Sequence, residues 1–551
     1  MRKKHLLLCF LLLTLFTLSG GCSHFQNPSS PKEDEVKFSE SMNLSIAFWD
    51  ITNMENAQSK DRLWSFIEEK FNINIQPISL NWSNYNDQYL IMAVSDTLPD
   101  IFPATAISGA STGGDFRLSS MVERGLLRPL PDDLSSYPEV ESVVEMLRNQ
   151  ITYSDGRIYT FPRMSFVDPT LGSSDAGLIV RKDWLKSLGL GEPKSLEEFI
   201  EMASAFANND PDGNGIKDTI GFNCGNRLVL GKWLALGVAP QLNIVSWTDE
   251  GGRFIPTYLS DGYLQIVLAL RKLYETGGLD PAFHLKKPAD VVYDFAKGKL
   301  GALEYKISPA TIAEVELYWN QYHDGDNASF EECVGLLNIF PASDGKYYSN
   351  SSTSFWSETL FSSRLDDKKT DRILHLFNYL LSDEGWMLTR FGLEKEDYSL
   401  DNGRFTCLID TSSDSLTGIL NNRYASLSLF ESLASWGGTE EDFIPNEQNV
   451  LRYGSYAAQL AYDALKWSQE HTLSVERPEE IISMIKPESK IFTPSLISRE
   501  VTQIIIEDGD PAGLWDNLIT RLRRLGLDEY VESVNRYAAQ MGIYSKTKTE
   551  K

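Results

Sequence analysis

The stretch from Leu44 to Leu80 places a helix between two strands, and this order constrains the fold more than any other part of the chain. "LSIAFWDI" is an apolar run typical of a buried strand, and "NINIQPISL" alternates apolar and polar residues as a second strand does. Between them, "DRLWSFIEEKF" repeats apolar residues at helical spacing. Two strands joined by a helix pair in parallel, because the connection is far longer than a hairpin turn. The pattern therefore predicts an α/β protein with a parallel sheet.

The chain is long enough for more than one hydrophobic core. It has 551 residues, and 42% of them are apolar and 11% aromatic, which is typical of a folded globular protein. We therefore expect at least two lobes. The formal net charge is -26 at pH 7, and so acidic a surface repels polyanions unless a local basic patch intervenes. We do not expect nucleic acid to be a partner.

The N-terminus has the three regions of a secretory signal peptide. A basic start precedes an apolar run from Leu6 to Leu18, and small residues then lead to Cys22. The apolar run is too short to be a comfortable membrane span. Small residues directly before a cysteine are typical of a bacterial lipoprotein signal, so we expect cleavage after Gly21 and attachment of acyl chains such as palmitate to Cys22. An ordinary signal peptide is the alternative, because Ser19 stands where a leucine is usual.

This interpretation places the mature protein on the extracytoplasmic face of the cell membrane. Residues 1–21 form the signal peptide, and the polar, proline-bearing stretch 22–41 tethers the lipid anchor to the folded part. Beyond the anchor the cysteines are Cys224, Cys333 and Cys407, which are far apart and odd in number. This spacing fits neither a disulfide framework nor a zinc site. We expect buried free thiols, with one bridge as the alternative.

Catalytic motifs are weak in this sequence. The six histidines are scattered and form neither an HExxH motif nor a local pair. One G-x-S-x-G occurs, "GASTG", with Ser111 at its centre, but the preceding "FPATAIS" does not have the bulk of the buried strand that a nucleophile elbow requires. We therefore predict a protein that is not an enzyme.

Five segments carry a family resemblance through their order along the chain. They are "SDTLPDIF", "GRIYTFPR", the long block from "LIVRKDW" to "KDTIGF", "FAKGKLGAL" and "LLSDEGWMLTRFGLE". Together they resemble the extracellular solute-binding proteins of family 1, the maltose-binding-protein-like group, and the long block resembles its LipO-type lipoprotein branch. The resemblance extends from about Leu44 to Met541 and is weakest from Asp401 to Thr493.

The resemblance implies a two-lobe α/β fold of the periplasmic-binding-protein type (type II), with ligand in an interlobe cleft. Lobe 1 would comprise residues 42–165 with 346–395, and lobe 2 would comprise 166–345 with 396–551. The implied function is that of a monomeric, membrane-tethered receptor, which captures a carbohydrate, most simply an oligosaccharide, and passes it to the permease subunits of an ABC importer. Another small solute is the alternative ligand. The alternative is a tethered, secreted carbohydrate-active hydrolase or lyase. Saturable binding of unchanged sugar would distinguish the receptor from the enzyme.

The loop "NNDPDGNGIKDTIGF" predicts a structural calcium site. Its oxygen donors fall at the first, third, fifth, seventh and ninth positions of an EF-hand-type loop, and they are Asp210, Asp212, Asn214, the carbonyl of Ile216, and Asp218. Two departures leave a solvated turn without an ion as the alternative. Gly221 stands where an EF-hand has glutamate, and Thr219 stands where the similar loops of alginate-oligosaccharide binders have a carboxylate.

The ligand residues are predicted from their places along the chain, since sugars need aromatic faces and fixed polar partners. Candidates near predicted strand ends and lobe crossings are Trp49, Asp50, Asp100, Arg163 and Trp356, with Trp247, Tyr305 and Trp319 added from lobe 2. Trp64, Trp184 and Trp386 lie in helical patterns and are assigned to the core.

Overall fold

The computed structural model describes residues 38–81, 84–105, 118–153, 155–166, 168–224, 232–240, 242, 247–323, 329–350, 355–412, 414–475, 492 and 494–540. The side chains at 119, 166, 169, 356, 436, 437, 494, 495 and 537 are also outside the described part. The chain divides into Met1–Glu40 and a compact unit, Ser41–Lys551, to which the following paragraphs refer. The predicted signal peptide, Cys22 and Ser111 therefore lie outside the described residues.

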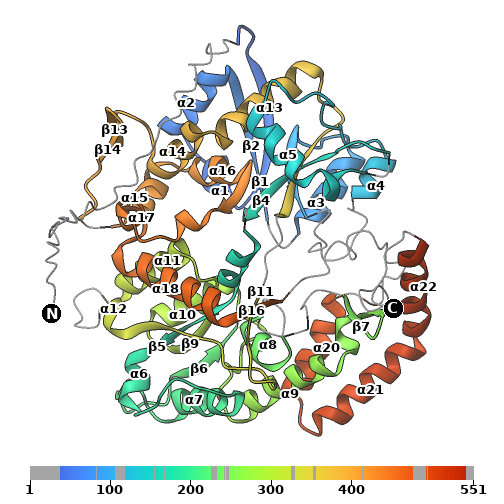
Figure 1. Ribbon diagram of the computed structural model, residues 1–551, viewed down its shortest axis with the longest axis vertical. Coiled ribbons are helices and arrows are strands. Elements are labelled where there is room, and N and C mark those ends of the chain that lie inside the picture. The colour runs from blue at the N-terminus through green and yellow to red at the C-terminus, as the bar shows by residue number, and fades with distance from the viewer. Residues whose placement is uncertain are drawn as a thin grey trace, which may run out of the picture. The chain divides into compact units, whose positions relative to one another are not determined.

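The first sheet has six strands in the order β15-β4-β12-β3-β1-β2. Strand β12 is antiparallel to both of its neighbours, and the other five strands run in one direction. The strands are β1 (Met42–Trp49), β2 (Ile73–Leu80), β3 (Ile101–Ala104), β4 (Thr160–Phe166), β12 (Phe355–Phe361) and β15 (Ser435–Gly438). Figure 1 shows this sheet in blue, teal, gold and orange.

The predicted strand–helix–strand unit is confirmed. β1 and β2 are parallel, with Met42 opposite Ile73, and α2 (Arg62–Phe71) connects them. The Asp61 carboxylate accepts a hydrogen bond from the backbone N–H of Trp64 and caps the first turn of the helix. At the other end Asn72 turns the chain in the left-handed region, with φ 46°.

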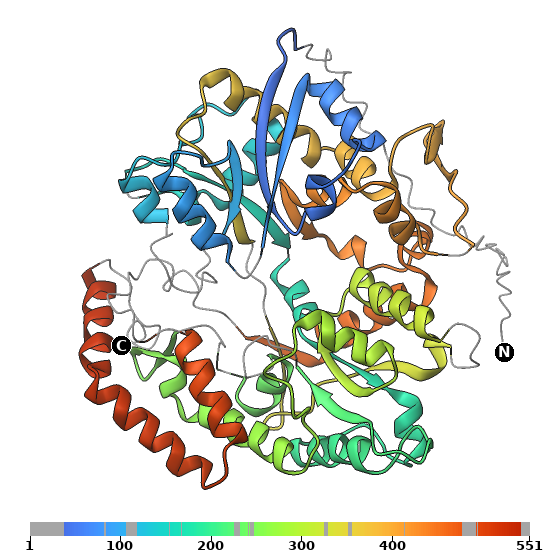
Figure 2. The same cartoon turned by 180° about the vertical axis from the view of Figure 1, so that it is seen from behind.

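Helices α2, α13 and α5 lie side by side against this sheet. The Tyr137 hydroxyl, directly before α5, donates to Asp371 of α13, and the guanidinium of Arg372 in α13 donates to the carbonyls of Phe71 and Asn72 at the end of α2. Helices of this part are α1 (Thr52–Glu55), α3 (Tyr85–Val94), α4 (Leu118–Glu123), α5 (Pro138–Ile151), α13 (Asp367–Leu381), α14 (Asp383–Phe391), α15 (Leu416–Arg423) and α16 (Leu427–Ser432). The hairpin of β13 (Tyr398–Asp401) and β14 (Arg404–Cys407) projects beside them (Figure 2).

The predicted lobe boundaries need correction after residue 395. The chain from 396 to 438 was assigned to lobe 2, but β15 pairs with β4 in the first sheet. The Ser426 N–H and hydroxyl also bond the carboxylate of Asp61 at the start of α2. The boundary near 346 shifts as well, because β11 (Tyr347–Asn350) pairs with β16 (Thr472–Val475) outside the first sheet. The position of these segments along the chain did not indicate their pairings, because the partners of a strand are determined by the tertiary fold.

The second sheet has four strands in the order β10-β5-β9-β6, with helices on both faces. The strands are β5 (Gly177–Arg181), β6 (Ile220–Asn223), β9 (Leu300–Tyr305) and β10 (Val334–Leu337). One face packs on α10 (Pro288–Ala296), α11 (Pro309–Tyr322), α12 (Phe330–Cys333) and α18 (Ser455–His471). The other face packs on α7 (Leu196–Asn208), α8 (Lys232–Val238) and α9 (Asp261–Glu275). Short elements nearby are η1 (Pro169–Asp175), α6 (Lys182–Ser187), η2 (Thr257–Leu259), η3 (Glu440–Asp442) and α17 (Glu447–Tyr453).

Three C-terminal helices extend the core that contains α9. They are α20 (Pro494–Ile506), α21 (Pro511–Arg524) and α22 (Leu527–Gln540), and they pack beside the hairpin of β7 (Trp247–Glu250) and β8 (Arg253–Pro256). The Asn535 side chain of α22 accepts a hydrogen bond from the Phe254 N–H at 2.9 Å and donates one to the Phe254 carbonyl at 2.7 Å. It therefore bonds both backbone groups of Phe254 on β8, as a neighbouring strand would. Among the described helices, none is both long and apolar enough to cross a membrane.

The predicted core tryptophans and free cysteines are mostly confirmed. Trp64 and Trp184 are buried, whereas Trp386 is half-buried against Phe391. Cys333 and Cys407 form no disulfide within the described part of the chain, and Cys224 and Cys333 are buried.

Candidate functional site

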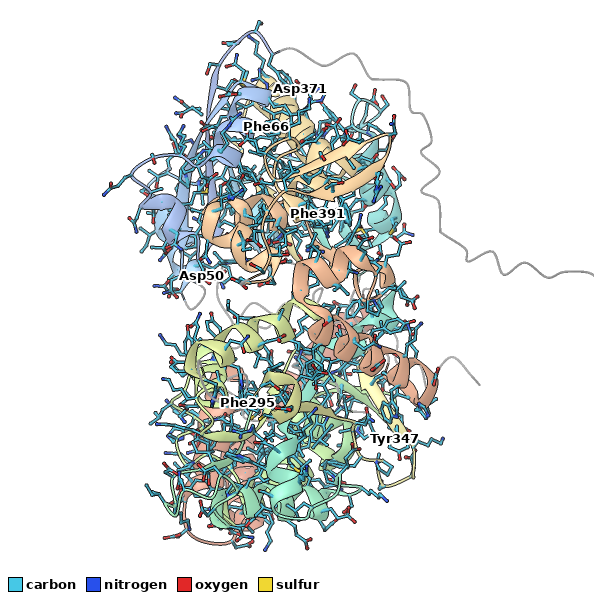
Figure 3. The ribbon with its side chains drawn as sticks, turned by 90° about the vertical axis from the view of Figure 1, so that its left-hand side faces the viewer. Asp50, Phe66, Phe295, Tyr347, Asp371 and Phe391 are labelled. Atoms are coloured by element: carbon cyan, nitrogen blue, oxygen red, sulfur yellow. The ribbon has the colours of Figure 1, made fainter. Side chains whose placement is uncertain are left out.

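The carboxyl ends of five parallel strands meet at one edge of the first sheet, which we call the first carboxyl edge. Ligands of open α/β sheets bind beyond such an edge. Trp49 ends β1, Asp50 follows it, Thr105 follows β3, and Ser165 lies near the end of β4. Figure 3 shows Asp50 at this end of β1.

An aromatic and cationic cluster lies behind this edge. The Trp49 ring meets the Tyr85 ring edge-on, with centroids 5.4 Å apart. The guanidinium of Arg163 lies 4.8 Å from the Trp49 centroid and 5.0 Å from that of Phe48. The Tyr85 hydroxyl shares a 2.9 Å hydrogen bond with Thr105. The cluster therefore holds an aromatic surface and hydroxyl groups in fixed orientation.

Arg163 is the electrostatic centre of this cluster. It has 0% exposure, and it donates to the Ser357 hydroxyl at 2.7 Å and to the Ser432 carbonyl at 3.0 Å. Burial lowers the pKa of its guanidinium, while the negative charge of Glu358, also fully buried, acts in the opposite direction. An arginine remains protonated at neutral pH, so Arg163 and Glu358 form a buried pair of opposite charges beneath Trp49.

Two groups reach the edge itself. Asp50 is exposed and adopts a left-handed conformation with φ 56°, held by its N–H bond to the Leu80 carbonyl. Partial burial raises the pKa of its carboxyl. The buried hydroxyl of Ser165 has no hydrogen-bond partner in the described part of the chain. Both groups are suited to bonding sugar hydroxyls.

A second carboxyl edge is formed where β6 and β9 end. The Tyr305 hydroxyl, at the end of β9, donates to Glu314 at 3.2 Å. The Glu304 carboxylate accepts from the backbone N–H of Lys232 at 2.6 Å, and the Lys306 ammonium lies 3.8 Å from Asp175. Gly177 opens the antiparallel strand here, and a Cβ on it would lie 2.1 Å from Ile307. This edge presents tyrosine, carboxylate and ammonium groups together.

The prediction for Asp100 is corrected by the structure. Asp100 precedes β3 and therefore lies at the amino end of the strand, away from the first carboxyl edge. Its carboxylate accepts from the N–H and hydroxyl of Ser45 and from the ammonium of Lys369. These bonds tie β1, β3 and α13 together.

Two predicted tryptophans are core residues instead. Trp319 has 0% exposure and stacks on His323, with ring centroids 4.1 Å apart. Trp247 is buried against Tyr530 of α22. Both side chains lie on the apolar side of their elements. A residue's position along the chain does not by itself show which side that is. Trp356 is the second residue of β12, which starts at the first carboxyl edge, but its side chain lies outside the described part.

The structure places Trp49, Asp50 and Tyr305 at the two carboxyl edges and Arg163 behind the first, together with neighbours that sequence reasoning missed. The missed residues are Tyr85, Thr105, Ser165, Glu358 and Trp436, the last known only by its backbone position in β15. Tyr85 is the first residue of α3, and a tyrosine in a helical pattern does not show which strand it will pack beside. Thr105 and Ser165 lie where β3 and β4 end, and periodicity predicts no strand that ends at either residue.

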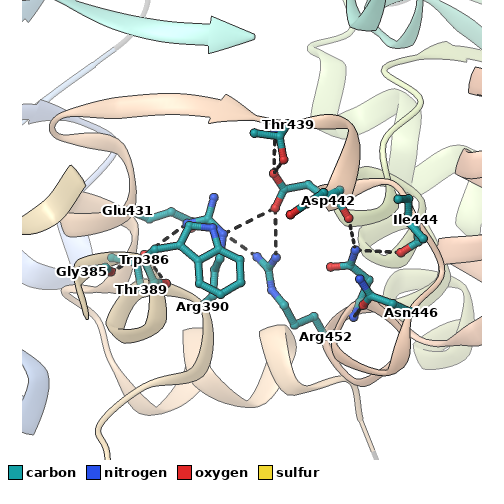
Figure 4. A network of polar contacts seen from close by, with 12 residues as sticks. Gly385, Trp386, Thr389, Arg390, Glu431, Thr439, Asp442, Ile444, Asn446 and Arg452 are labelled. Atoms are coloured by element: carbon teal, nitrogen blue, oxygen red, sulfur yellow. Dashed lines mark hydrogen bonds and ion pairs between the residues drawn. The ribbon is translucent and has the colours of Figure 1, made fainter. Parts of the chain in front are cut away.

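A polar network joins the segment after β15 to both neighbouring helices (Figure 4). Asp442 lies 3.6 Å from Arg390 of α14 and 3.9 Å from Arg452 of α17, and it accepts from the N–H of Thr439 at 2.7 Å. Arg452 is 4% exposed and also lies 4.0 Å from Glu431. The network therefore fixes the segment by which the chain leaves the first sheet after β15.

The predicted calcium loop folds around the amide of Asn214. That amide donates to Asp212 at 2.9 Å and to Asp218 at 3.3 Å, and the Gly215 N–H donates to Asp210 at 3.0 Å. Burial, followed by the neighbouring carboxylates, raises the pKa of Asp212. The Oδ1 atom of Asp210 is buried and has no partner among the described residues.

This loop fits a cation in part. Converging carboxylates and an orphaned oxygen are what a cation would satisfy, but the described residues contain no group of three or more acidic, cysteine or histidine side chains arranged to hold a metal. The missing EF-hand glutamate has a steric cause. Gly221 lies inside β6, where a Cβ would be 2.0 Å from the Ala203 carbonyl oxygen, so the chain re-enters the sheet before a twelfth ligand could reach the ion.

Comparison with known proteins finds similarity to a lipoprotein and to a polysaccharide-binding protein. Lipoprotein LipO of Bacillus subtilis is 24% identical over 549 residues, which is 97% of this chain and 98% of that protein. The polygalacturonan/rhamnogalacturonan-binding protein YtcQ of the same organism is 26% identical over 54% of this chain and 56% of its own length. No family model matches the chain.

Solved structures share the fold. The Streptococcus pneumoniae ABC-transporter substrate-binding protein FusA in complex with kestose aligns with a TM-score of 0.65, at 18% identity, over 91% of this chain and 99% of FusA. An EF-hand mutant of FusA in complex with fructo-nystose aligns equally, with a TM-score of 0.65, 17% identity and the same coverage. The predicted two-lobe α/β fold is therefore confirmed.

Proposed function

We propose that this chain, a relative of the LipO-type sugar-binding lipoproteins of ABC importers, captures an oligosaccharide outside the cell and delivers it to a membrane permease. The observation that carries the proposal is the first carboxyl edge, where Asp50 and Ser165 lie in front of a buried aromatic and cationic cluster of Trp49, Tyr85 and Arg163. Sugars suit an edge that combines aromatic and polar groups, because their C–H faces are apolar and their hydroxyls need fixed partners.

The ligand would lie between the two carboxyl edges. Asp50 and Ser165 supply polar groups from the first sheet, and Tyr305 and Lys306 supply them from the second. Contacts to both sheets would favour a closed arrangement, since a ligand shifts a conformational equilibrium only through differential contacts. YtcQ is named for binding a pectic polymer and the FusA structure contains kestose, so both acidic and neutral saccharides belong in the test.

The test is calorimetric titration of the purified protein with fructo-oligosaccharides and with oligogalacturonides. Saturable binding, with the sugar recovered unchanged, supports the receptor. Formation of shorter or unsaturated products would instead support the alternative, a tethered hydrolase or lyase. Ser165→Ala is a mild site variant, because it removes one hydroxyl from the edge, and we expect about tenfold weaker binding.

For the metal, we propose that the loop from Asp210 to Asp218 binds calcium as a structural ion. Asp210, Asp212 and Asp218, with the amide oxygen of Asn214 and the Ile216 carbonyl, would hold it after the Asn214 amide reorients. A bound ion would fix the path from α7 to β6. Millimolar calcium should then raise the melting temperature and a chelator lower it, because an ion that binds only the folded state stabilises that state. An Asp212→Ala variant with the same calcium response as wild type would contradict this site.

For the location, we propose that Cys22 carries a lipid anchor on the extracytoplasmic face and that the protein acts as a monomer beside its permease. A diacylglycerol supplies the two acyl chains that stable anchoring requires. Mass spectrometry of the mature N-terminal peptide should show the lipid, and Cys22→Ala should remove it. A soluble wild-type protein without lipid mass would contradict the anchor.

A further inference from the structure

One face of α11 carries a line of polar and aromatic side chains that are only partly buried. The inward face buries Ile312, Val315 and Trp319. Glu314, Tyr318 and Tyr322 follow a four-residue spacing on a different face, so successive side chains stand about 6 Å apart along the helix axis.

Neighbouring elements complete this line. The Tyr305 hydroxyl donates to Glu314 at 3.2 Å, and the Tyr293 ring of α10 meets the Tyr318 ring with centroids 4.8 Å apart. The Lys297 ammonium lies 5.2 Å from the Tyr322 centroid. We call this set of six residues, Tyr293, Lys297, Tyr305, Glu314, Tyr318 and Tyr322, the α11 stripe.

The α11 stripe is partly exposed, whereas two other aromatic residues on the same helices are buried. Phe295 and Trp319, on the same two helices, have 0% exposure (Phe295 is labelled in Figure 3). Tyr293 and Tyr318 are half-buried, and Tyr322 is 46% exposed. Exposure of an aromatic ring to water is unfavourable compared with packing against a partner. A row of partly exposed rings along one helix face is therefore typical of a binding surface.

The stripe is continuous with the second carboxyl edge. Tyr305 belongs to both, because it ends β9 and bonds Glu314 on the first turns of α11. Burial, followed by the hydrogen bond with Tyr293, raises the pKa of Tyr318 to about 12, so its hydroxyl stays protonated at neutral pH. The surface therefore offers ring faces, neutral hydroxyl donors and one carboxylate acceptor in sequence.

We propose that the α11 stripe is an extended saccharide subsite, which binds the sugar units that continue beyond those held at the carboxyl edges. The inference rests on the proposed function and deepens it, since it makes the natural ligand an oligosaccharide longer than a disaccharide. The rings of Tyr318 and Tyr322 would pack on the apolar faces of successive sugar units, and Glu314 would accept from their hydroxyls.

A length series separates this subsite from the primary site. Wild-type protein and its Tyr322→Ala and Tyr318→Phe variants are titrated with fructo-oligosaccharides and oligogalacturonides of increasing length. Wild-type affinity should increase with length, and Tyr322→Ala should weaken binding of the longer members about tenfold while leaving the shortest binder unchanged. Tyr318→Phe keeps the ring and should lose less. Tyr274→Ala, a half-buried tyrosine on α9 across the sheet, is the matched control.

The outcomes distinguish the subsite from the proposed function. Length-independent wild-type binding, or an equal loss by Tyr322→Ala at every length, would overturn the subsite and leave the receptor intact. A Tyr322→Ala variant with wild-type affinity for all lengths would do the same. No binding of any saccharide by the wild type would overturn both. Because Tyr322 is exposed and its ring is absent from the core, loss of folding is not expected to obscure the result.

Discussion

Replacing Arg163 by methionine tests whether the candidate site is held by a buried charge pair. The variant loses hydrogen bonds to the Ser357 hydroxyl and the Ser432 carbonyl, and it removes the positive charge that interacts with the fully buried Glu358. Removing one charge of a buried pair of opposite charges costs about 3 to 5 kcal/mol. We expect a loss of that size in the free energy of unfolding, measured by urea denaturation followed by circular dichroism.

A second substitution isolates the electrostatic part of this loss. Glu358→Gln in the Arg163→Met background removes the remaining charge of the pair, so the double variant should recover at least about 1 kcal/mol. Arg157→Met, at an exposed position, is the control and should change the free energy of unfolding by less than about 0.5 kcal/mol. If Arg163→Met behaves like this control, or if Glu358→Gln recovers nothing, the site does not depend on a buried charge pair.

Three further substitutions test other parts of the fold. Burial raises the pKa of Glu316 from 4.5 to about 7, so the folded state binds this proton more tightly than the unfolded state does. The free energy of unfolding should therefore fall by up to about 3 kcal/mol as the pH rises from about 4.5 to 7. Glu316→Gln should remove this pH dependence in urea denaturation measured across the same pH range. Gly221→Ala places a methyl group against the Ala203 carbonyl, and a melting temperature equal to wild type would refute this steric argument. Asn535→Ala leaves both backbone groups of Phe254 without their partner, and we expect a loss of about 1 to 3 kcal/mol, detectable as faster hydrogen exchange at β8.

Several features could be predicted because they are local. The first strand–helix–strand unit follows from the change between alternating and helical periodicity. The loop from Asp210 to Asp218 shows its pattern of oxygen donors in consecutive positions. The family resemblance then supplied the two-lobe fold, which the solved relatives confirm.

The site depended on information that no short stretch contains. Trp49, Tyr85 and Arg163 come from three separate elements, and only the strand order β4-β12-β3-β1 brings them together. Asp100 and Trp319 have suitable chemistry, yet one lies at the amino edge and the other in the core.

The sequence by itself determined which segments form strands and helices, because periodicity and capping act within a few residues. Only the tertiary structure decided that β15 pairs with β4 in the first sheet, that the chain enters β6 at Gly221 directly after the Asp210–Asp218 loop, and that one face of α11 remains partly exposed. The physical reason is that strand pairing and burial are long-range. They depend on which distant surfaces meet, and a residue's own neighbours in the chain carry little of that information.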